Sequence, residues 1–171
     1  GGKDSSFTAH LLKYKYGMNP LTVTWAPHLY TDVGWKNLQS WIHSGFDNTL
    51  LSPNGKLHRL LTRLAYENLC HPFQPFIIGQ RLIGPRFSAL NGIKLVFYGE
   101  NQAEYGNDIE ENDRPTMDPA FFHEAKPGLD GLHLGGVPAK ELVERHGIEP
   151  RDLNPYLPPD GERLRRLGTE V

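Results

Sequence analysis

The chain opens with a run that combines glycine, a cation, a carboxylate and hydroxyls: residues 1–6 are GGKDSS. A segment with apolar residues at helical spacing follows, from Ser5 to Tyr16. Glycines let backbone N–H groups approach phosphate oxygens, and the N-terminus of a helix adds positive partial charge. Lys3 can supply a point charge, and Asp4 can hold Mg²⁺ together with phosphate oxygens. The run therefore predicts an oligophosphate site at the start of a helix.

The spacing excludes a Walker A loop, which has four residues between its first glycine and its Gly-Lys pair. The run resembles the SGGxDS loop of the PP-loop ATP pyrophosphatase superfamily, with the first serine missing. Enzymes of that superfamily cleave ATP between the α and β phosphates and transfer AMP to a substrate oxygen. The resemblance implies ATP and Mg²⁺ as cofactors, with Gly1, Gly2, Lys3, Ser5 and Ser6 at the phosphates. The alternative is an ordinary Gly-Gly turn before a helix that a serine caps.

Three segments are typical of strands. Residues 21–25 (LTVTW) are β-branched and bounded by prolines, residues 47–51 are a weaker candidate, and residues 94–98 (KLVFY) are the clearest. Helical patterns lie between them, so the sequence predicts an α/β protein with a doubly wound parallel sheet. Ligands bind at the carboxyl ends of such strands, so Glu100 and Asn101, just after the third segment, should face the same crevice as residues 1–6.

Composition divides the chain into two parts. Residues 1–107 are expected to form a nucleotide-binding α/β domain, and residues 108–171 a loop-rich, partly helical continuation packed on that domain. A phosphate loop should follow a buried strand, so we expect the first strand of the domain to be missing from a chain that begins in mid-motif. Prolines and glycines in residues 71–91 predict short, kinked helices. The other expected helices cover residues 31–45, 54–70, 119–124, 138–146 and 162–167.

Composition narrows the class of protein. Lys and Arg number 18 against 20 Asp and Glu, which gives no support to extended nucleic-acid binding. No run is long and apolar enough for membrane insertion, and the simplest location is the cytoplasm. The single cysteine, Cys70, is expected to be a buried thiol. Without a nucleophilic Cys in a Cys-His-Glu arrangement, the chain cannot release ammonia from glutamine by itself. The histidines lack zinc-ligand spacing.

Three longer segments carry a narrower resemblance: residues 24–39 (TWAPHLYTDVGWKNLQ), 71–81 (HPFQPFIIGQR) and 98–107 (YGENQAEYGN). They are similar to the N-acetyl sugar amidotransferases of surface-polysaccharide biosynthesis, including that of lipopolysaccharide O-antigen. The resemblance covers nearly the whole chain, which would be a central fragment of a longer protein. It implies conversion of the N-acetyl group of a sugar, typically nucleotide-linked, to an acetamidino group through an adenylylated intermediate.

The resemblance also implies partners. Ammonia would come from a glutaminase subunit like that of imidazole glycerol phosphate synthase, passed across by a cyclase-like companion. The acidic, Pro- and Gly-rich region after Gly106 is a candidate docking face, and a plain solvated loop is its alternative.

The adenylation step suggests roles for residues near the phosphate loop. Lys3 and Asp4 would be catalytic, and Asp4 and Glu100 would hold Mg²⁺. Each carboxylate has an alternative, because Asp4 can cap the first helix and Glu100 can be a solvated loop residue. Asn101 would bind a phosphate or merely occupy a left-handed turn.

Other candidates concern the base and the sugar. Thr24 and Trp25 end a strand where relatives hold adenine, although we favour a core position for the Trp25 ring. Arg81 and Arg86 suit a sugar-linked diphosphate or a uronate, or are helix-surface arginines.

Two rival functions remain. A PP-loop tRNA-modifying enzyme, such as a thiolase or lysidine synthetase, would show a basic surface, and thiolases need a catalytic cysteine. A non-catalytic nucleotide-binding module would not need Lys3, Asp4 and Glu100 together.

Overall fold

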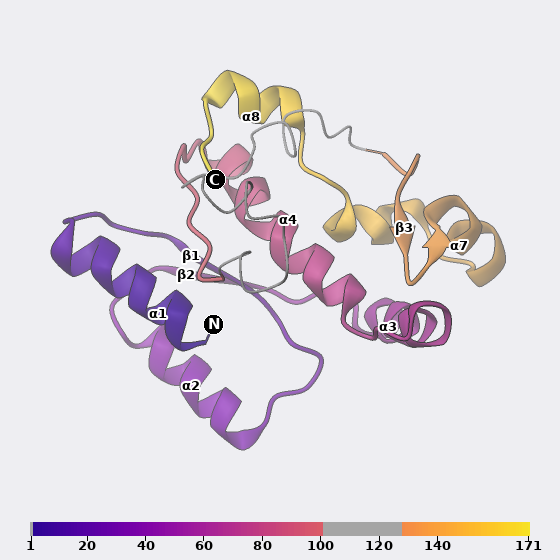
Figure 1. The fold of residues 1–171 in the computed structure, drawn as a ribbon, viewed down its shortest axis with the longest axis horizontal. Coiled ribbons are helices and arrows are strands. Elements are labelled where there is room, and N and C mark those ends of the chain that lie inside the picture. The colour runs from indigo at the N-terminus through magenta and orange to yellow at the C-terminus, as the bar shows by residue number, and fades with distance from the viewer. Residues whose placement is uncertain (1, 101–127) are drawn as a thin grey trace, which may run out of the picture.

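The computed structural model describes residues 2–100 and 128–171. Figure 1 shows a mixed α/β arrangement of helices around short strands. In chain order the elements are α1 (Lys3–His10), the π-helical η1 (Leu11–Lys15), β1 (Thr22–Trp25), α2 (Asp32–Ile42), β2 (Asn48–Leu51), α3 (Gly55–Leu69), α4 (Gln74–Asn91), β3 (His133–Leu134), β4 (Val137–Pro138), α7 (Ala139–His146), the 3₁₀-helical η3 (Pro150–Tyr156) and α8 (Gly161–Leu167).

The strands form two small sheets. β1 and β2 pair in parallel, with Thr22 opposite Asn48 and Trp25 opposite Leu51, and β3 and β4 form an antiparallel pair. Two predicted strands and their parallel direction are therefore confirmed. Because the parallel sheet in the described part of the chain has two strands, a doubly wound sheet is not confirmed.

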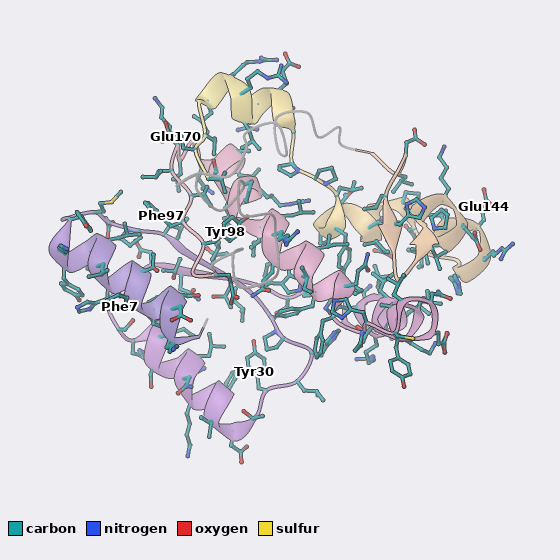
Figure 2. All side chains as sticks on the ribbon, in the orientation of Figure 1. Phe7, Tyr30, Phe97, Tyr98, Glu144 and Glu170 are labelled. Atoms are coloured by element: carbon teal, nitrogen blue, oxygen red, sulfur yellow. The ribbon has the colours of Figure 1, made fainter. Side chains whose placement is uncertain are left out.

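The third predicted strand, residues 94–98, is wrong as a strand. It makes a single parallel bridge, between Leu95 and Glu170. The Val96 N–H donates to the Glu170 carbonyl at 2.9 Å, and the Glu170 N–H donates to the Lys94 carbonyl at 2.8 Å. Among the described residues, only the short stretch after α8 pairs with this segment through its backbone, and the pairing stops at one bridge. Figure 2 shows Phe97 and Tyr98 pointing to opposite sides, with Tyr98 toward α4.

The expectation of short helices in residues 71–91 is also wrong, because α4 is one helix of 18 residues that continues through Pro85. Glycine has a low helix propensity, but two glycines of α4 lie where the helix packs closely on other segments. A Cβ on Gly79 would stand 2.6 Å from a ring carbon of Trp25, and one on Gly84 would stand 2.9 Å from Val96. The glycines therefore let α4 lie directly against both β1 and the segment after it.

The helix ends follow local sequence signals. The side chains of Thr31, Asn54 and Asp160 accept hydrogen bonds from N–H groups in the first turns of α2, α3 and α8. α2 ends at Ile42, before the expected Gly45. Residues 138–146 and 162–167 match α7 and α8 to within one residue, and residues 119–124 lie outside the described part.

Cys70 corrects another expectation, because its side chain is exposed and not buried. It follows the last residue of α3 with a left-handed backbone, at φ of 52°. At this position the chain turns between α3 and α4.

The main core lies between α3, α4, β1 and the C-terminal elements. It buries Trp25, Leu61, Leu134, Leu142, Leu153 and Tyr156. Residues 128–171 thus contribute directly to the core that α3 and α4 build. Within the described residues, no helix is long and apolar enough to cross a membrane.

Candidate functional site

The start of α1 differs from the expected glycine loop. Lys3 and Asp4 are its first helical residues, and Gly2 occupies the N-cap. Neither Ser5 nor Ser6 occupies the N-cap position, which is Gly2, and the Ser6 hydroxyl donates to the Gly2 carbonyl at 3.1 Å. Gly1 lies outside the described residues. The exposed first turn therefore offers backbone donors, a lysine and a carboxylate.

The turn at Gly99 meets this first turn. A Cβ atom on Gly99 would stand 2.6 Å from the Ser5 Cβ and closer still to the Ser5 Cα and Oγ. Asp4 precedes Ser5 and Glu100 follows Gly99, so two carboxylate-bearing residues flank one tight backbone contact. Both are exposed. Asn101 lies outside the described residues.

The residues expected at adenine end β1. The Thr24 hydroxyl lies 3.4 Å from the Asn48 Oδ1 on β2. Trp25 is 4% exposed, and its ring packs on Gly79 and lies edge-on to Tyr156 at 5.5 Å between ring centroids. The core position that we favoured for Trp25 is therefore confirmed. Its Nε1 is buried and has no hydrogen-bond partner among the described residues.

The two arginines have different surroundings. The Arg86 Nη2 donates to the carbonyls of Asn154 and Leu157 at 2.6 and 2.7 Å, and burial lowers the pKa of its guanidinium. These bonds join α4 to η3 and give Arg86 a structural role. The Arg81 side chain is exposed, and the backbone carbonyl of Arg81 accepts a hydrogen bond from the Tyr98 hydroxyl.

A histidine cluster beside β1 was missed at the sequence level. His58 on α3 is 1% exposed, stacks with His28 at 4.0 Å between ring centroids, and bonds through Nδ1 to the Tyr156 hydroxyl at 2.6 Å. Desolvation, and then the charge of His28, lower the pKa of His58 to about 4. One signal was available, because residue 58 lies beside the apolar stripe formed by Leu57, Leu61 and Leu64.

An apolar hollow of about 260 Å³ opens next to this cluster. It lies at the segment that leaves β1 and at the start of α4, and its walls are Pro27, His28, Leu29, Phe73 and Phe76. His28 is therefore shared by the cluster and the hollow.

Asp4 and Glu100 could bind Mg²⁺ only if phosphate oxygens and water supplied the remaining ligands. No group of three or more His, Cys, Asp or Glu side chains with metal-site geometry occurs in residues 2–100 and 128–171. Mg²⁺ usually takes one or two carboxylates and completes its shell with phosphate oxygens and water. Asp4 and Glu100 would supply the two carboxylates of such a site, since the residues next to them, Ser5 and Gly99, are in contact.

No protein-family model matches the chain, and no curated protein matches it.

Proposed function

We propose that this chain carries the ATP site of an amidotransferase that converts the N-acetyl group of a sugar to an acetamidino group. One observation carries the proposal: Gly99 contacts Ser5, so the exposed first turn of α1 and the turn that bears Glu100 adjoin. Two segments far apart in the chain thereby adjoin, and together they carry a lysine, two carboxylates and the N–H groups of a helix N-terminus. This is the set of groups that binding of a nucleoside triphosphate requires.

The chemistry explains why those groups are needed. An acetamide oxygen is a poor leaving group, and transfer of AMP to it creates a better one while pyrophosphate is released. The N–H groups from Gly2 to Ser6 and the Lys3 ammonium would stabilise charge on the departing phosphates. Asp4 and Glu100 would hold Mg²⁺, which would supply further positive charge at the phosphate oxygens.

The remaining candidates take narrower roles in this proposal. Thr24 would contact adenine through its backbone. The Trp25 ring lies in the core and would hold the end of β1 in place. Arg81 stays a candidate for an anionic group of the sugar because its guanidinium is exposed. The Arg86 guanidinium already binds two carbonyls, so we assign substrate contact to Arg81 first.

Nitrogen would come from a separate glutaminase, with a cyclase-like companion to conduct ammonia. The intact protein should accept free ammonium in vitro. Supplied with glutamine alone, the Cys70→Ser protein should make no acetamidino product. Product formation under these conditions would overturn the two-component scheme.

The deciding experiment incubates the intact protein with ATP, Mg²⁺, ammonium and candidate N-acetyl sugars, including nucleotide-linked ones. We expect pyrophosphate release and, by mass spectrometry, a sugar in which NH replaces O. ATP binding without pyrophosphate release under all conditions would favour a non-catalytic nucleotide-binding module. Pyrophosphate release stimulated by tRNA and not by sugars would favour a tRNA-modifying enzyme.

A further inference from the structure

The Thr62 hydroxyl determines which nitrogen of His28 carries a proton. Thr62 Oγ1 donates its single proton to the His58 carbonyl at 2.8 Å, as α-helical threonines do. The same oxygen lies 2.9 Å from the His28 Nε2. With its proton already used, Thr62 can only accept there, so the His28 Nε2 must be the donor. In the neutral ring the Nδ1 atom therefore keeps its lone pair.

The surroundings of His28 keep that ring neutral. Desolvation, and then the charge of Arg59, lower the pKa of His28 below its usual value. The charged or titratable groups placed against it come from α3: His58, stacked beneath its ring, and Arg59. Neither offers a negative charge that would favour the imidazolium form.

The free nitrogen belongs to a residue that faces open space. His28 is exposed and forms part of the wall of the hollow with Leu29 and Phe73. In the described part of the chain its Nδ1 has no hydrogen-bond partner. Figure 1 shows the segment that bears it leaving β1 and running toward α3 before it turns to α2. His28 therefore follows the carboxyl end of a parallel strand, the edge where such sheets bind ligands.

We propose that His28 is the general base of the amidation step, that Thr62 positions it, and that the hollow receives the acetamido group of the acceptor. This rests on the proposed function and extends it from the phosphates to the acceptor, whose acetamido oxygen would carry AMP while its carbon accepts ammonia. The apolar walls suit the acetamido methyl group.

The proton balance shows why a base is needed. Ammonia adds its lone pair to the carbon of the protonated imidate and forms a C–N bond while the C=N π pair moves to the sugar nitrogen, which leaves a positively charged nitrogen with three protons on the incoming group. His28 Nδ1 takes one of them and becomes imidazolium. The C–O bond to AMP then breaks, AMP leaves with the electron pair, and the amidine remains in its protonated form. His28 returns its proton to solvent.

The experiment separates the two half-reactions in the intact protein. His28→Gln should keep ATP-dependent pyrophosphate release near the wild-type rate but form acetamidino product about 10²-fold more slowly, the size of a lost general base. Thr62→Val should show a smaller loss of the same kind, and Thr62→Ser should restore it. The exposed His71→Gln is the matched control and should change neither rate.

The outcomes are distinguishable. If wild-type protein releases no pyrophosphate, the proposed function fails and the base role fails with it. If pyrophosphate is released but His28→Gln makes product at the wild-type rate, or loses both steps equally, only the base role is overturned.

Nitrogen NMR of the histidines gives a readout that does not depend on activity. His28 should be protonated at Nε2 at neutral pH. In Thr62→Val, His28 should populate both neutral tautomers. Protonation at Nδ1 in the wild type overturns the proposal.

Discussion

The backbone of Gly99 lies against Ser5 with no room for a side chain, since a Cβ on Gly99 would stand 2.6 Å from the Ser5 Cβ. The φ angle of Gly99 is not in the left-handed region, so close approach is the reason for glycine here.

Gly99→Ala should push the turn that bears Glu100 away from α1. A displacement near 1 Å at a reacting centre costs about 10²-fold in rate, so we expect a loss of that order in kcat/KM for pyrophosphate release. Gly55→Ala is the matched control, because its Cβ would meet only the end of the Arg59 side chain at 3.5 Å. Equal activity of the two variants, both folded by circular dichroism, would remove the contact from the mechanism.

Asp4→Asn and Glu100→Gln should each abolish ATP-dependent pyrophosphate release while thermal unfolding stays unchanged, because both side chains are exposed. The reason is the loss of a carboxylate ligand for Mg²⁺. Raising the Mg²⁺ concentration should partly restore activity in either variant. Asp32→Asn, in the corresponding first turn of α2, is the control and should behave as wild type. Near-normal activity of a site variant at limiting Mg²⁺ would refute the metal role of that residue.

Lys3→Ala should lower kcat by about 10²-fold, the size expected for one preorganised charge contact. Lys56→Ala, in the first turn of α3, is the matched control. A change confined to the KM of the sugar would place Lys3 outside the phosphate site.

The folded protein should lose stability as pH falls from neutral to about 4. His58 has a pKa of about 4 in the fold against 6.5 for an exposed histidine, because its ring is desolvated beside His28. Below pH 6.5 the unfolded chain therefore binds a proton that the folded chain does not, and the free energy of unfolding decreases by up to about 3 kcal/mol. Below about pH 4 both forms are protonated, and the contribution of His58 levels off. Urea unfolding across this range measures the slope. His58→Gln should flatten it and the exposed His146→Gln should not, so equal slopes in both variants would contradict the assignment.

Arg86→Ala should lower the free energy of unfolding by about 2–3 kcal/mol, since its two charge-assisted bonds, to the carbonyls of Asn154 in η3 and of Leu157 just after it, are lost. Arg81→Ala, on the exposed side of α4, should change it by less than about 0.5 kcal/mol. Denaturant unfolding of both variants tests the structural role. An unfolding free energy for Arg86→Ala equal to that of wild type would return Arg86 to the list of substrate-binding candidates.

Local signals in the sequence determined much of the secondary structure. Thr31, Asn54 and Asp160 precede α2, α3 and α8 as capping residues, and the β-branched stretch before Trp25 forms β1 as expected. These signals act within a few residues, so the sequence alone is enough to recognise them. The residue types of the candidate phosphate site were also visible in the sequence.

Tertiary packing decided the rest, because the partners lie far apart in the chain. Residues 94–98 have strand composition, yet in the part of the chain that the structure describes they make one bridge, between Leu95 and Glu170. The glycines of residues 71–91 suggested breaks, but Gly79 allows α4 to pack on Trp25, and this packing outweighs the low helix propensity of glycine. The tautomer of His28 depends on Thr62 in α3, a relation that no spacing in the sequence reveals.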